Sequence, residues 1–322
     1  MTIEQARVRA LPKPWGMLDL RPWSSARSDD GAIGEIWYER PSRVATEPSL
    51  LLKILFTNQP LSIQVHPDDA FAQSIGLPNG KTEAWYILAA APEAKVALGL
   101  DRSLTLQQLR EAVDDGSIAD RVVWRAVSAG EAIFVPAGTI HAIGTGLVIA
   151  EIQQRSDATF RLFDYGRQRE LHIESAVAVA NAEPATSQAL PDRLTNDRTL
   201  LVSSPHFVLE RINLRPNAAW RLEAERETWL LALDGGARVG AFDLGIGDAV
   251  FAQSDCVDIH AGPTGMVCLA AYTGGDIVAN LLERIRPVAA TDAGLPQGVK
   301  VPTFLPLAKA ASPVDGRPGF FQ

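Results

Sequence analysis

The sequence predicts a mainly β protein that contains two related β-barrels and a few short helices. Segments in which polar and apolar residues alternate recur along the chain, as in residues 34–40 and 61–66, and this pattern is typical of strands with one buried face. Helical periodicity is confined to short stretches such as residues 104–116, where Gly116 is placed to end the helix. An internal repeat of the strand-like segments is the third observation, and it implies two barrels of related topology.

The repeat joins two pairs of segments. Residues 83–89, EAWYILA, match residues 227–233, ETWLLAL, with the tryptophan at the same place. Residues 130–142, GEAIFVPAGTIHA, match residues 247–261, GDAVFAQSDCVDIHA, with two inserted residues. Two segments repeated in the same order indicate that one barrel follows the other along the chain.

Residues 1–60 are expected to form an irregular opening segment followed by two strands. Three prolines punctuate the start: Pro12, Pro14 and Pro22. The first strand is predicted at residues 34–40, which alternate, and the second at residues 50–56, a nearly continuous apolar run that Lys53 interrupts. A lysine in such a run usually marks a strand edge or extends its ammonium group to solvent.

The next two predicted strands carry three potential metal ligands. Gln64 and His66 lie two residues apart, so on a strand their side chains leave the same face. Pro67 ends that strand because it has no amide donor, and it suits the first turn of a short helix over residues 68–73. Glu83 then begins a strand, EAWYILA, whose aromatic and branched residues fit a pleated sheet. These polar groups would form the row that a metal site inside a barrel needs.

Residues 130–144, GEAIFVPAGTIHAIG, contain the most specific pattern in the sequence. Gly130, Pro136, Gly138 and His141 follow the spacing G-x5-P-x-G-x2-H. Physically this pattern predicts a strand, a tight turn and a second strand that presents His141. We therefore expect His141 to be a ligand of the same metal site.

Residues 146–167 are expected to continue as strand, polar turn and strand. Arg161 has apolar neighbours in this segment, which indicate partial burial, and a buried arginine must face an anion or hydrogen-bond acceptors. His172 introduces an alanine-rich segment that ends near Leu190, and we expect this segment to link the barrels without a metal role.

The composition limits the classes of partner. At 322 residues, with 47% hydrophobic and 21% charged residues, the chain has the composition of a soluble globular protein. Its net charge of −8 argues against nucleic acid, because no excess of cations exists to neutralise phosphates. Cys256 and Cys268 imply no disulfide framework. The sequence shows no leader pattern and no apolar run long enough to span a membrane, so we predict a cytoplasmic protein. We separately expect a monomer or a homodimer.

The motif ending at His141 resembles the second signature of the cupin superfamily, which consists of small jelly-roll barrels that hold a divalent metal. Four segments in order, LSIQVHPDD, GKTEAWYIL, PAGTIHAIG and EIQQRSDATFRLFDYGR, resemble class I mannose-6-phosphate isomerase in its short bacterial form. The resemblance covers residues 15–169 well and the second barrel loosely. It implies two cupin-like jelly-roll barrels, a bicupin, and an isomerase that interconverts mannose 6-phosphate and fructose 6-phosphate through a cis-enediol or enediolate.

The resemblance also implies a site, residue by residue. It assigns the metal ligands to four residues: Gln64, His66, Glu83 and His141. This oxygen and nitrogen set suits one Zn²⁺ used as a Lewis acid, and manganese, cobalt or iron are alternatives. Glu151 matches the glutamate proposed as the acid/base of the family. Arg161 matches the family's active-site arginine, which is thought to stabilise the charged intermediate. Lys81 matches a family position near the sugar phosphate, and it lies two residues before Glu83, so a strand would point both inward. We expect Lys81 in the catalytic set.

Three further residues match family positions near the sugar phosphate: Ser62, Lys53 and Arg167. A hydroxyl group with two cations would hold the phosphate, and Arg167 in place of a lysine allows a bidentate contact. The family pattern is altered in residues 77–79, Leu-Pro-Asn, which precede the GKTE motif, but no ligand is removed.

We expect residues 1–190 to form the catalytic metal-binding barrel with a short helical insertion, and residues 191–290 a degenerate second barrel. The second copy lacks the Pro/Gly turn and the strand with His66, and Glu227 and His260 alone would make a weak site. Residues 291–322, rich in Pro, Gly and Ala, are expected to form an extended or partly disordered tail. Two alternative functions remain at this point, a cupin metal oxygenase and a non-catalytic sugar-binding bicupin.

Overall fold

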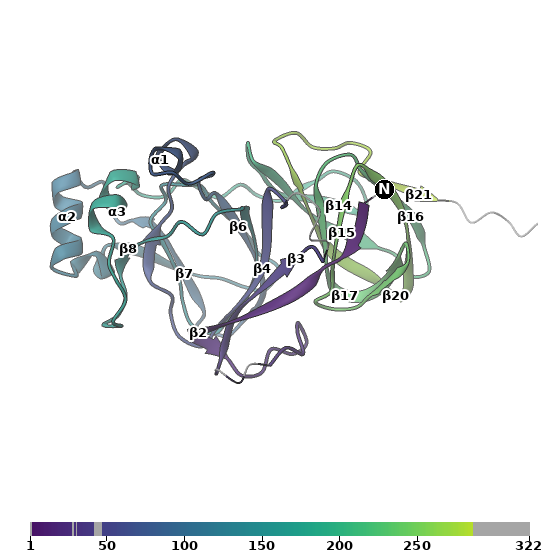
Figure 1. Ribbon diagram of the computed structural model, residues 1–322, viewed down its shortest axis with the longest axis horizontal. Coiled ribbons are helices and arrows are strands. Elements are labelled where there is room, and N and C mark those ends of the chain that lie inside the picture. Colours follow the sequence, from purple (N-terminus) through teal and green to yellow (C-terminus); the bar gives the residue numbers. More distant parts are fainter. Residues whose placement is uncertain (1, 28, 30, 42–46, 286–322) are drawn as a thin grey trace, which may run out of the picture. The chain divides into compact units, whose positions relative to one another are not determined.

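A computed structural model describes residues 2–27, 29, 31–41 and 47–285 of the chain. These residues form three antiparallel β-sheets with few helices, which confirms the mainly β prediction (Figure 1). The predicted tail, residues 291–322, lies outside the described residues.

The first half of the chain contains a six-stranded and a five-stranded sheet. The six-stranded sheet has the order β2 (Arg7–Met17), β3 (Ile33–Glu39), β4 (Leu50–Thr57), β11 (Leu147–Gln154), β6 (Glu83–Ala90) and β9 (Ala132–Val135). The five-stranded sheet has the order β12 (Phe160–Phe163), β5 (Ile63–Val65), β10 (His141–Ile143), β7 (Lys95–Leu100) and β8 (Val122–Ala126). Side chains of both sheets share one apolar cluster, which includes Trp85, Val96 and Ile149. The two sheets therefore pack face to face, as in a jelly roll.

The five-stranded sheet is covered by helices on its other face, where α2 (Leu106–Asp114), α3 (Ile173–Val179) and the 3₁₀ helix η1 (Ser117–Asp120) pack (Figure 1). Helix α2 begins at the capping box of Thr105 and Gln108 and ends just before Gly116, whose φ is 80°. Helix α1 (Asp69–Ser74) begins at Asp68, whose carboxylate accepts the amide of Phe71. Both helices lie where the sequence predicts them. Helix α3 was not predicted, because its alanine-rich sequence gives only a short apolar stripe.

The opening segment differs from the expectation. Residues 7–17 were predicted to be irregular because of Pro12 and Pro14, but they form β2. Strand β2 pairs only with β3, so it is an edge strand, and the register shifts beside Pro12. Proline is tolerated at such a position because its missing amide faces no partner strand.

The second half forms a ten-stranded sheet around its own apolar core. Its main path is β1 (Thr2–Gln5), β19 (Ala249–Gln253), β17 (Thr228–Val239), β20 (Asp255–Thr273), β15 (Phe207–Leu214), β14 (Arg198–Ser203) and β13 (Asp192–Arg193). Three strands lie off this path: β16 (Ala219–Ala224), β18 (Phe242–Leu244) and β21 (Leu282–Ile285). The order β4-β11-β6-β9 of the first half is repeated as β15-β20-β17-β19, in agreement with the internal duplication. Strand β1, from the other end of the chain, completes this sheet, and the predicted boundary after residue 190 stays a prediction.

The two halves differ in which way the repeated tryptophan faces. Trp85 packs in the interior of the first barrel with Ile87, whereas Trp229 packs in the cluster that the two halves share, and its neighbour Leu230 fills the second barrel. A shift of one residue moves every side chain of a strand to the opposite face. The similar sequences EAW and ETW thus direct their side chains to opposite faces of the strand. Glu227 is therefore not the structural equivalent of Glu83.

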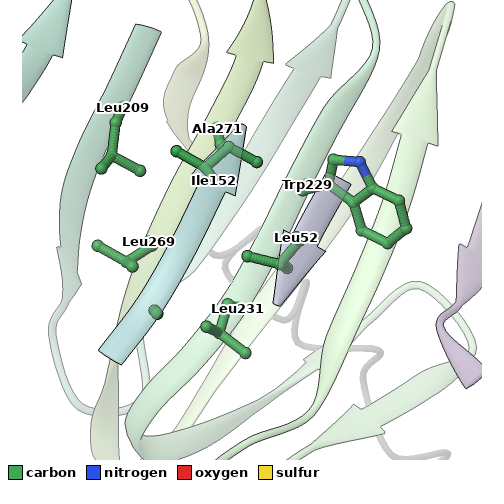
Figure 2. A pocket seen from close by; sticks show the side chains of 8 residues that line it. Leu52, Ile152, Leu209, Trp229, Leu231, Leu269 and Ala271 are labelled. Atoms are coloured by element: carbon green, nitrogen blue, oxygen red, sulfur yellow. The ribbon is translucent and has the colours of Figure 1, made fainter. Parts of the chain in front are cut away.

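The shared cluster joins the six-stranded sheet to the second half. Figure 2 shows Leu52 and Ile152 of the first half facing Leu209, Trp229 and Leu269 of the second. They enclose a cavity of only about 10 Å³ with an apolar lining. So small an apolar space is expected to stay dry, and the contact is therefore a packed core.

Glu227 makes a polar contact across this junction. Its buried carboxylate accepts the backbone amides of Ser49 and Leu50 at 2.6 and 2.7 Å. These amides stand at the start of β4, the strand that carries Lys53. The second half thus fixes the beginning of a strand that contributes to the first barrel.

Glu227→Ala should lower the free energy of unfolding by about 1–3 kcal/mol, because the buried amide of Leu50 would lose its acceptor. Denaturant unfolding followed by circular dichroism measures this change. Glu225→Ala, which removes an exposed carboxylate from the same loop, is the control and should change stability by less than about 0.5 kcal/mol. Equal stability of the two variants would contradict the role of Glu227.

Candidate metal centre and active-site pocket

The register of the sheets brings the predicted ligands together. His141, the first residue of β10, lies opposite Gln64 of β5, and Arg161 of β12 lies opposite Gln64 on its other side. Glu83 begins β6, one strand away from Glu151 in β11. Residues far apart in sequence therefore converge on the space between the two sheets.

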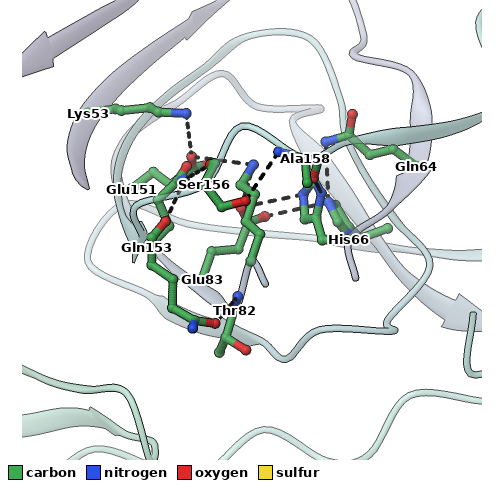
Figure 3. Close-up of polar contacts among 12 residues, drawn as sticks. Lys53, Gln64, His66, Thr82, Glu83, Glu151, Gln153, Ser156 and Ala158 are labelled. Atoms are coloured by element: carbon green, nitrogen blue, oxygen red, sulfur yellow. Dashed lines mark hydrogen bonds and ion pairs between the residues drawn. The ribbon is translucent and has the colours of Figure 1, made fainter. Parts of the chain in front are cut away.

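The three ionisable candidates form one buried group. His66, Glu83 and His141 each offer a ligand atom, and these atoms lie within 4.8 Å of one another. Nε2 of His66 is 3.6 Å from Oε2 of Glu83, and Nε2 of His141 is 3.5 Å from Oε1. Figure 3 shows the carboxylate of Glu83 directed toward the imidazole of His66. Among the described residues, no other group of three His, Cys, Asp or Glu side chains has this geometry.

Both imidazoles are held in the form that binds a metal. Nδ1 of His66 lies 2.8 Å from the carbonyl oxygen of Ala158, and Nδ1 of His141 lies 2.8 Å from that of Thr139. Each Nδ1 must carry the proton to donate to a carbonyl, so each Nε2 keeps its lone pair. Burial, with the nearby Lys81 ammonium, lowers the pKa of His66 to about 3, and burial also lowers the pKa of His141. Both rings are therefore neutral at physiological pH.

Gln64 completes the group after one rotation of its amide. Its Nε2 lies 3.3 Å from Nε2 of His141, and its Oε1 accepts the hydroxyl of Ser62 at 3.1 Å. A half-turn of the amide exchanges the two atoms and brings the oxygen to the imidazole side. Gln64 can thus supply a fourth, neutral oxygen ligand.

The donor set fits a divalent cation. Nε2 of His66 is buried without a hydrogen-bond partner among the described residues, and such an atom in a fully enclosed position needs a ligand. Two neutral imidazoles, one carboxylate and one amide provide nitrogen and oxygen donors without a thiolate, which zinc and several other divalent metals accept.

Glu83 is ionised despite its burial. Burial alone would raise its pKa, but the Lys81 ammonium, 3.0 Å away, holds that pKa well below its usual range. The indole Nε1 of Trp85 also donates to Oε1 of Glu83 at 3.1 Å. The carboxylate is thus oriented and charged, as a metal ligand must be.

Glu151 lies next to this group in a different electrostatic environment. Its Oε1 is 3.4 Å from Nζ of Lys53 and 4.0 Å from Nζ of Lys81 (Figure 3). Burial and the charge of Glu83 raise the pKa of Glu151, against the opposing effect of the two lysines. Two neighbouring carboxylates whose pKa values move in opposite directions are typical of an acid/base site.

Lys53 is fully buried in the interior of the sheet. The expected edge or solvent-directed position is therefore wrong, because β4 lies between β3 and β11 and both of its faces are covered. The buried ammonium is stabilised by Glu151 and by the ring of Trp37, 4.7 Å away.

A pocket of about 280 Å³ opens beside the cluster. Of the predicted residues it is lined by Lys53, Ser62, Gln64, Lys81, Glu151 and Arg161. Nε of Arg161 is buried, and its guanidinium has no hydrogen-bond partner within the described part of the chain. Such a cation needs an anion, and the pocket is where a ligand could provide one.

Arg167 has a different position. Its guanidinium contacts Asp164 and donates to the carbonyl oxygen of Pro60 at 2.7 Å, and it is not among the residues that line the pocket. Arg169, two residues later, does line the pocket and also pairs with Asp164. The phosphate role of Arg167 stays a prediction that this geometry does not support.

Several pocket residues were missed from the sequence: Lys13, Trp15, Glu35, Asp157, Thr159, Arg169 and His172. Nδ1 of His172 accepts the backbone amide of Arg161 at 3.3 Å, so the residue expected in a linker stands at the site. Only two features of the sequence could have drawn attention to these residues: the prolines on both sides of Lys13, and the two arginines, Arg167 and Arg169, that follow Arg161. Neither has a spacing that points to this pocket.

The second half holds no comparable group among the described residues. Glu227 binds backbone amides, and His260 is exposed on β20. Glu227 and His260 thus belong to no metal-binding group in the described part of the chain, and the degenerate second barrel stays a prediction.

Comparisons with known proteins give a consistent result. No family model matches the chain. Over 174 residues it is 40% identical to mannose-6-phosphate isomerase of Streptococcus mutans, a match that covers 50% of this chain and 53% of that protein. Over 183 residues it is 34% identical to mannose-6-phosphate isomerase ManA of Bacillus subtilis, with 53% and 57% coverage. The chain thus spans about half the length of the curated relatives it matches.

The structural likeness extends further. The crystal structure of mannose 6-phosphate isomerase from Bacillus subtilis superposes with a TM-score of 0.73 at 20% identity, covering 84% of this chain and all of that one. A variant of phosphomannose isomerase from Salmonella typhimurium gives a TM-score of 0.66 at 15% identity, with 85% and full coverage. The fold is that of the phosphomannose isomerases. The predicted cupin-like fold class is confirmed.

None of the described helices is long and apolar enough to span a membrane.

The cluster predicts binding of one divalent cation per chain. His141→Ala should abolish stoichiometric binding of Zn²⁺, because one of few ligands is removed. Metal content after dialysis, measured by mass spectrometry, tests this. His260→Ala, which removes an exposed imidazole outside the cluster, should keep the wild-type content. Full metal occupancy in the His141 variant would show that the cluster is not the metal centre.

Proposed function

We propose that the protein is a metal-dependent aldose–ketose isomerase that interconverts mannose 6-phosphate and fructose 6-phosphate through a cis-enediol or enediolate. The observation that carries the proposal is the buried His66–Glu83–His141 group beside Glu151 in a pocket rich in cations. The relatives named mannose-6-phosphate isomerase at 34–40% identity support it. We also propose a cytoplasmic location and a monomer or homodimer.

Gln64, His66, Glu83 and His141 would hold the metal, which we propose to be Zn²⁺. When bound, a divalent cation there supplies Lewis-acid stabilisation of negative charge on the sugar oxygens. The proposed set has one carboxylate and no thiolate, so the ion would keep most of its positive charge. An oxygenase is not favoured, because the lysines and arginines of the pocket suit an anionic substrate.

Glu151 would move the proton between C1 and C2. Aldose–ketose interconversion removes a proton from one carbon and returns it to the next, and a single carboxylate within reach of both can do so. The pKa of Glu151 is raised toward neutral pH, which suits a group that must accept and then release a proton. Lys53 and Lys81 orient the carboxylate from two sides.

Lys81 and Arg161 would stabilise the charge that develops on oxygen. Burial alone would lower the pKa of Lys81, but Glu83 and Glu151 outweigh burial and raise that pKa, so the ammonium stays charged. The guanidinium of Arg161, whose Nε has no hydrogen-bond partner among the described residues, would donate to the enediolate oxygens. Cations that the protein already holds in position stabilise a transition state more than water does, because they need not reorganise during the reaction.

Ser62 and Lys53, with Arg167, were assigned to the phosphate by resemblance. Ser62 and Lys53 line the pocket and could contact a phosphorylated sugar. Arg167 could act by holding Asp164, which in turn holds Arg169 at the pocket wall.

The function is tested by turnover of mannose 6-phosphate in an assay coupled to fructose 6-phosphate. Purified protein should be active, lose activity after treatment with a chelator, and regain it when Zn²⁺ is restored, because the metal would neutralise developing charge. No turnover by metal-loaded protein would contradict the proposed substrate. Activity that survives complete metal removal would contradict the metal dependence.

Arg161→Ala should keep the metal and lower kcat by about 100- to 1000-fold, as loss of one transition-state donor does. Steady-state kinetics and metal content are measured on the same preparation. Arg110→Ala, a change on the exposed surface of α2, is the control with wild-type kinetics. Unchanged kcat in the Arg161 variant would remove that residue from the catalytic set.

A further inference from the structure

We propose that Lys13 binds the phosphate of the substrate and that Glu35 positions Lys13 for this contact. The inference rests on the proposed function, since it assumes a phosphorylated sugar in the pocket. Neither residue was singled out for a function from the sequence, and both line the pocket.

The two residues extend a row of alternating charges across the six-stranded sheet. Lys13 stands on β2, Glu35 on β3, Lys53 on β4 and Glu151 on β11, in the order in which these strands neighbour one another. Glu35 is 3.1 Å from Nζ of Lys13, and Glu151 is 3.4 Å from Nζ of Lys53. The catalytic carboxylate is therefore one end of a series whose other end is Lys13.

The backbone around Lys13 is restricted before any substrate binds. Lys13 lies between Pro12 and Pro14, so the ring of Pro14 disfavours a helical conformation at Lys13. The stem of Lys13 crosses Gly34, where an added Cβ would come within 2.5 Å of Cβ of Lys13. Gly34 thus leaves the space through which the lysine side chain reaches the pocket.

Glu35 uses one carboxylate oxygen to hold the ammonium of Lys13 and the other to accept a neutral indole N–H. Oε1 faces Lys13, and Oε2 accepts the indole Nε1 of Trp37 at 2.7 Å. The Trp37 ring in turn contacts the ammonium of Lys53. Burial alone would raise the pKa of Glu35, but Lys53 and Lys13 lower that pKa, so the carboxylate is charged and can act as the anchor.

Lys13 is the pocket lysine with the most access to an incoming ligand. Its side chain is 29% exposed, against 4% for Lys53 and 6% for Lys81. An ammonium has three donors, and Glu35 takes one of them. Lys53 and Lys81 are enclosed beside Glu151, whereas Lys13 keeps donors for a group near the opening.

Arg169 adds a second cation to the lining of the same pocket. The ammonium of Lys13 lies 5.5 Å from the centre of the Trp15 ring, and the guanidinium of Arg169 lies 5.1 Å from it. Both cations are held by a carboxylate, Lys13 by Glu35 and Arg169 by Asp164. Two positioned cations that line the same pocket favour binding of a dianionic phosphate there.

Lys13→Met should raise the KM for mannose 6-phosphate roughly tenfold to a hundredfold, the effect of losing one hydrogen bond between charged groups, with a much smaller change in kcat. The inhibition constant of inorganic phosphate should rise in parallel. Lys13→Arg, which keeps the charge, should restore most of the affinity. A Lys13→Met enzyme with the wild-type KM and phosphate inhibition would overturn the proposal.

Arg7→Met is the matched control. Arg7 lies on the same strand and pairs with Glu39 of β3 at 3.1 Å, the same distance as Lys13 to Glu35, but it is exposed and does not line the pocket. The control variant loses one cation and one cross-strand ion pair without altering KM. An equal rise of KM in both variants would show that only net charge or sheet stability matters.

Glu35→Gln tests the positioning role. It should raise KM in the wild-type enzyme and have no further effect on KM in the Lys13→Met enzyme, because both changes act through one contact. Equal, additive effects of Glu35→Gln in both backgrounds would show a general structural role and contradict positioning.

Direct binding separates this proposal from the proposed function. If wild-type protein failed to turn over mannose 6-phosphate, the proposed function would fall, while calorimetric titration with inorganic phosphate would still test Lys13. Weaker phosphate binding by Lys13→Met but not by Arg7→Met supports the phosphate site. Equal phosphate binding by all three proteins contradicts it.

Discussion

The buried carboxylate of Glu83 is the interaction on which the first barrel depends. An ionised carboxylate away from water is costly unless its charge and its lone pairs are matched. Here Lys81 matches the charge, the Trp85 indole donates to one oxygen, and His66 and His141 face the carboxylate. These groups come from different strands or from the segments beside them. Stabilising one charge therefore fixes how the strands of both sheets lie relative to each other.

The six-stranded sheet combines this polar interior with an apolar outer face. On β4, Lys53 points into the pocket while its neighbours Leu52 and Ile54 pack in the cluster shared with the second half. A strand buried on both faces appears in the sequence as an almost continuous apolar run. The second half thus acts as a packing surface that keeps water from the outer face, and it does so without a metal group of its own among the described residues.

Local spacing predicted the residues that short motifs carry. Gln64 and His66 share a strand face, and the turn before His141 is set by Pro136 and Gly138, so their placement needed no knowledge of the fold. Lys13 and Glu35 could not be found in this way, because only the pairing of β2 with β3, and of β3 with β4, brings them to the pocket.

The predictions that were wrong or missing also depend on strand pairing, which short motifs do not reveal. Trp85 and Trp229 point to opposite faces of equivalent strands although the sequences around them are similar, because a shift of one residue reverses the face of every side chain. Strand β2 was missed because proline disfavours most strand positions but not an edge. Strand β1 joins β19, with Thr2 opposite Gln253, so nearly the whole described chain must be synthesised before this strand finds its partner. During translation the amides of β1 have no partner strand until β19 has been made. The pairing of β1 with β19, which completes the ten-stranded sheet, is therefore a late, long-range step of folding.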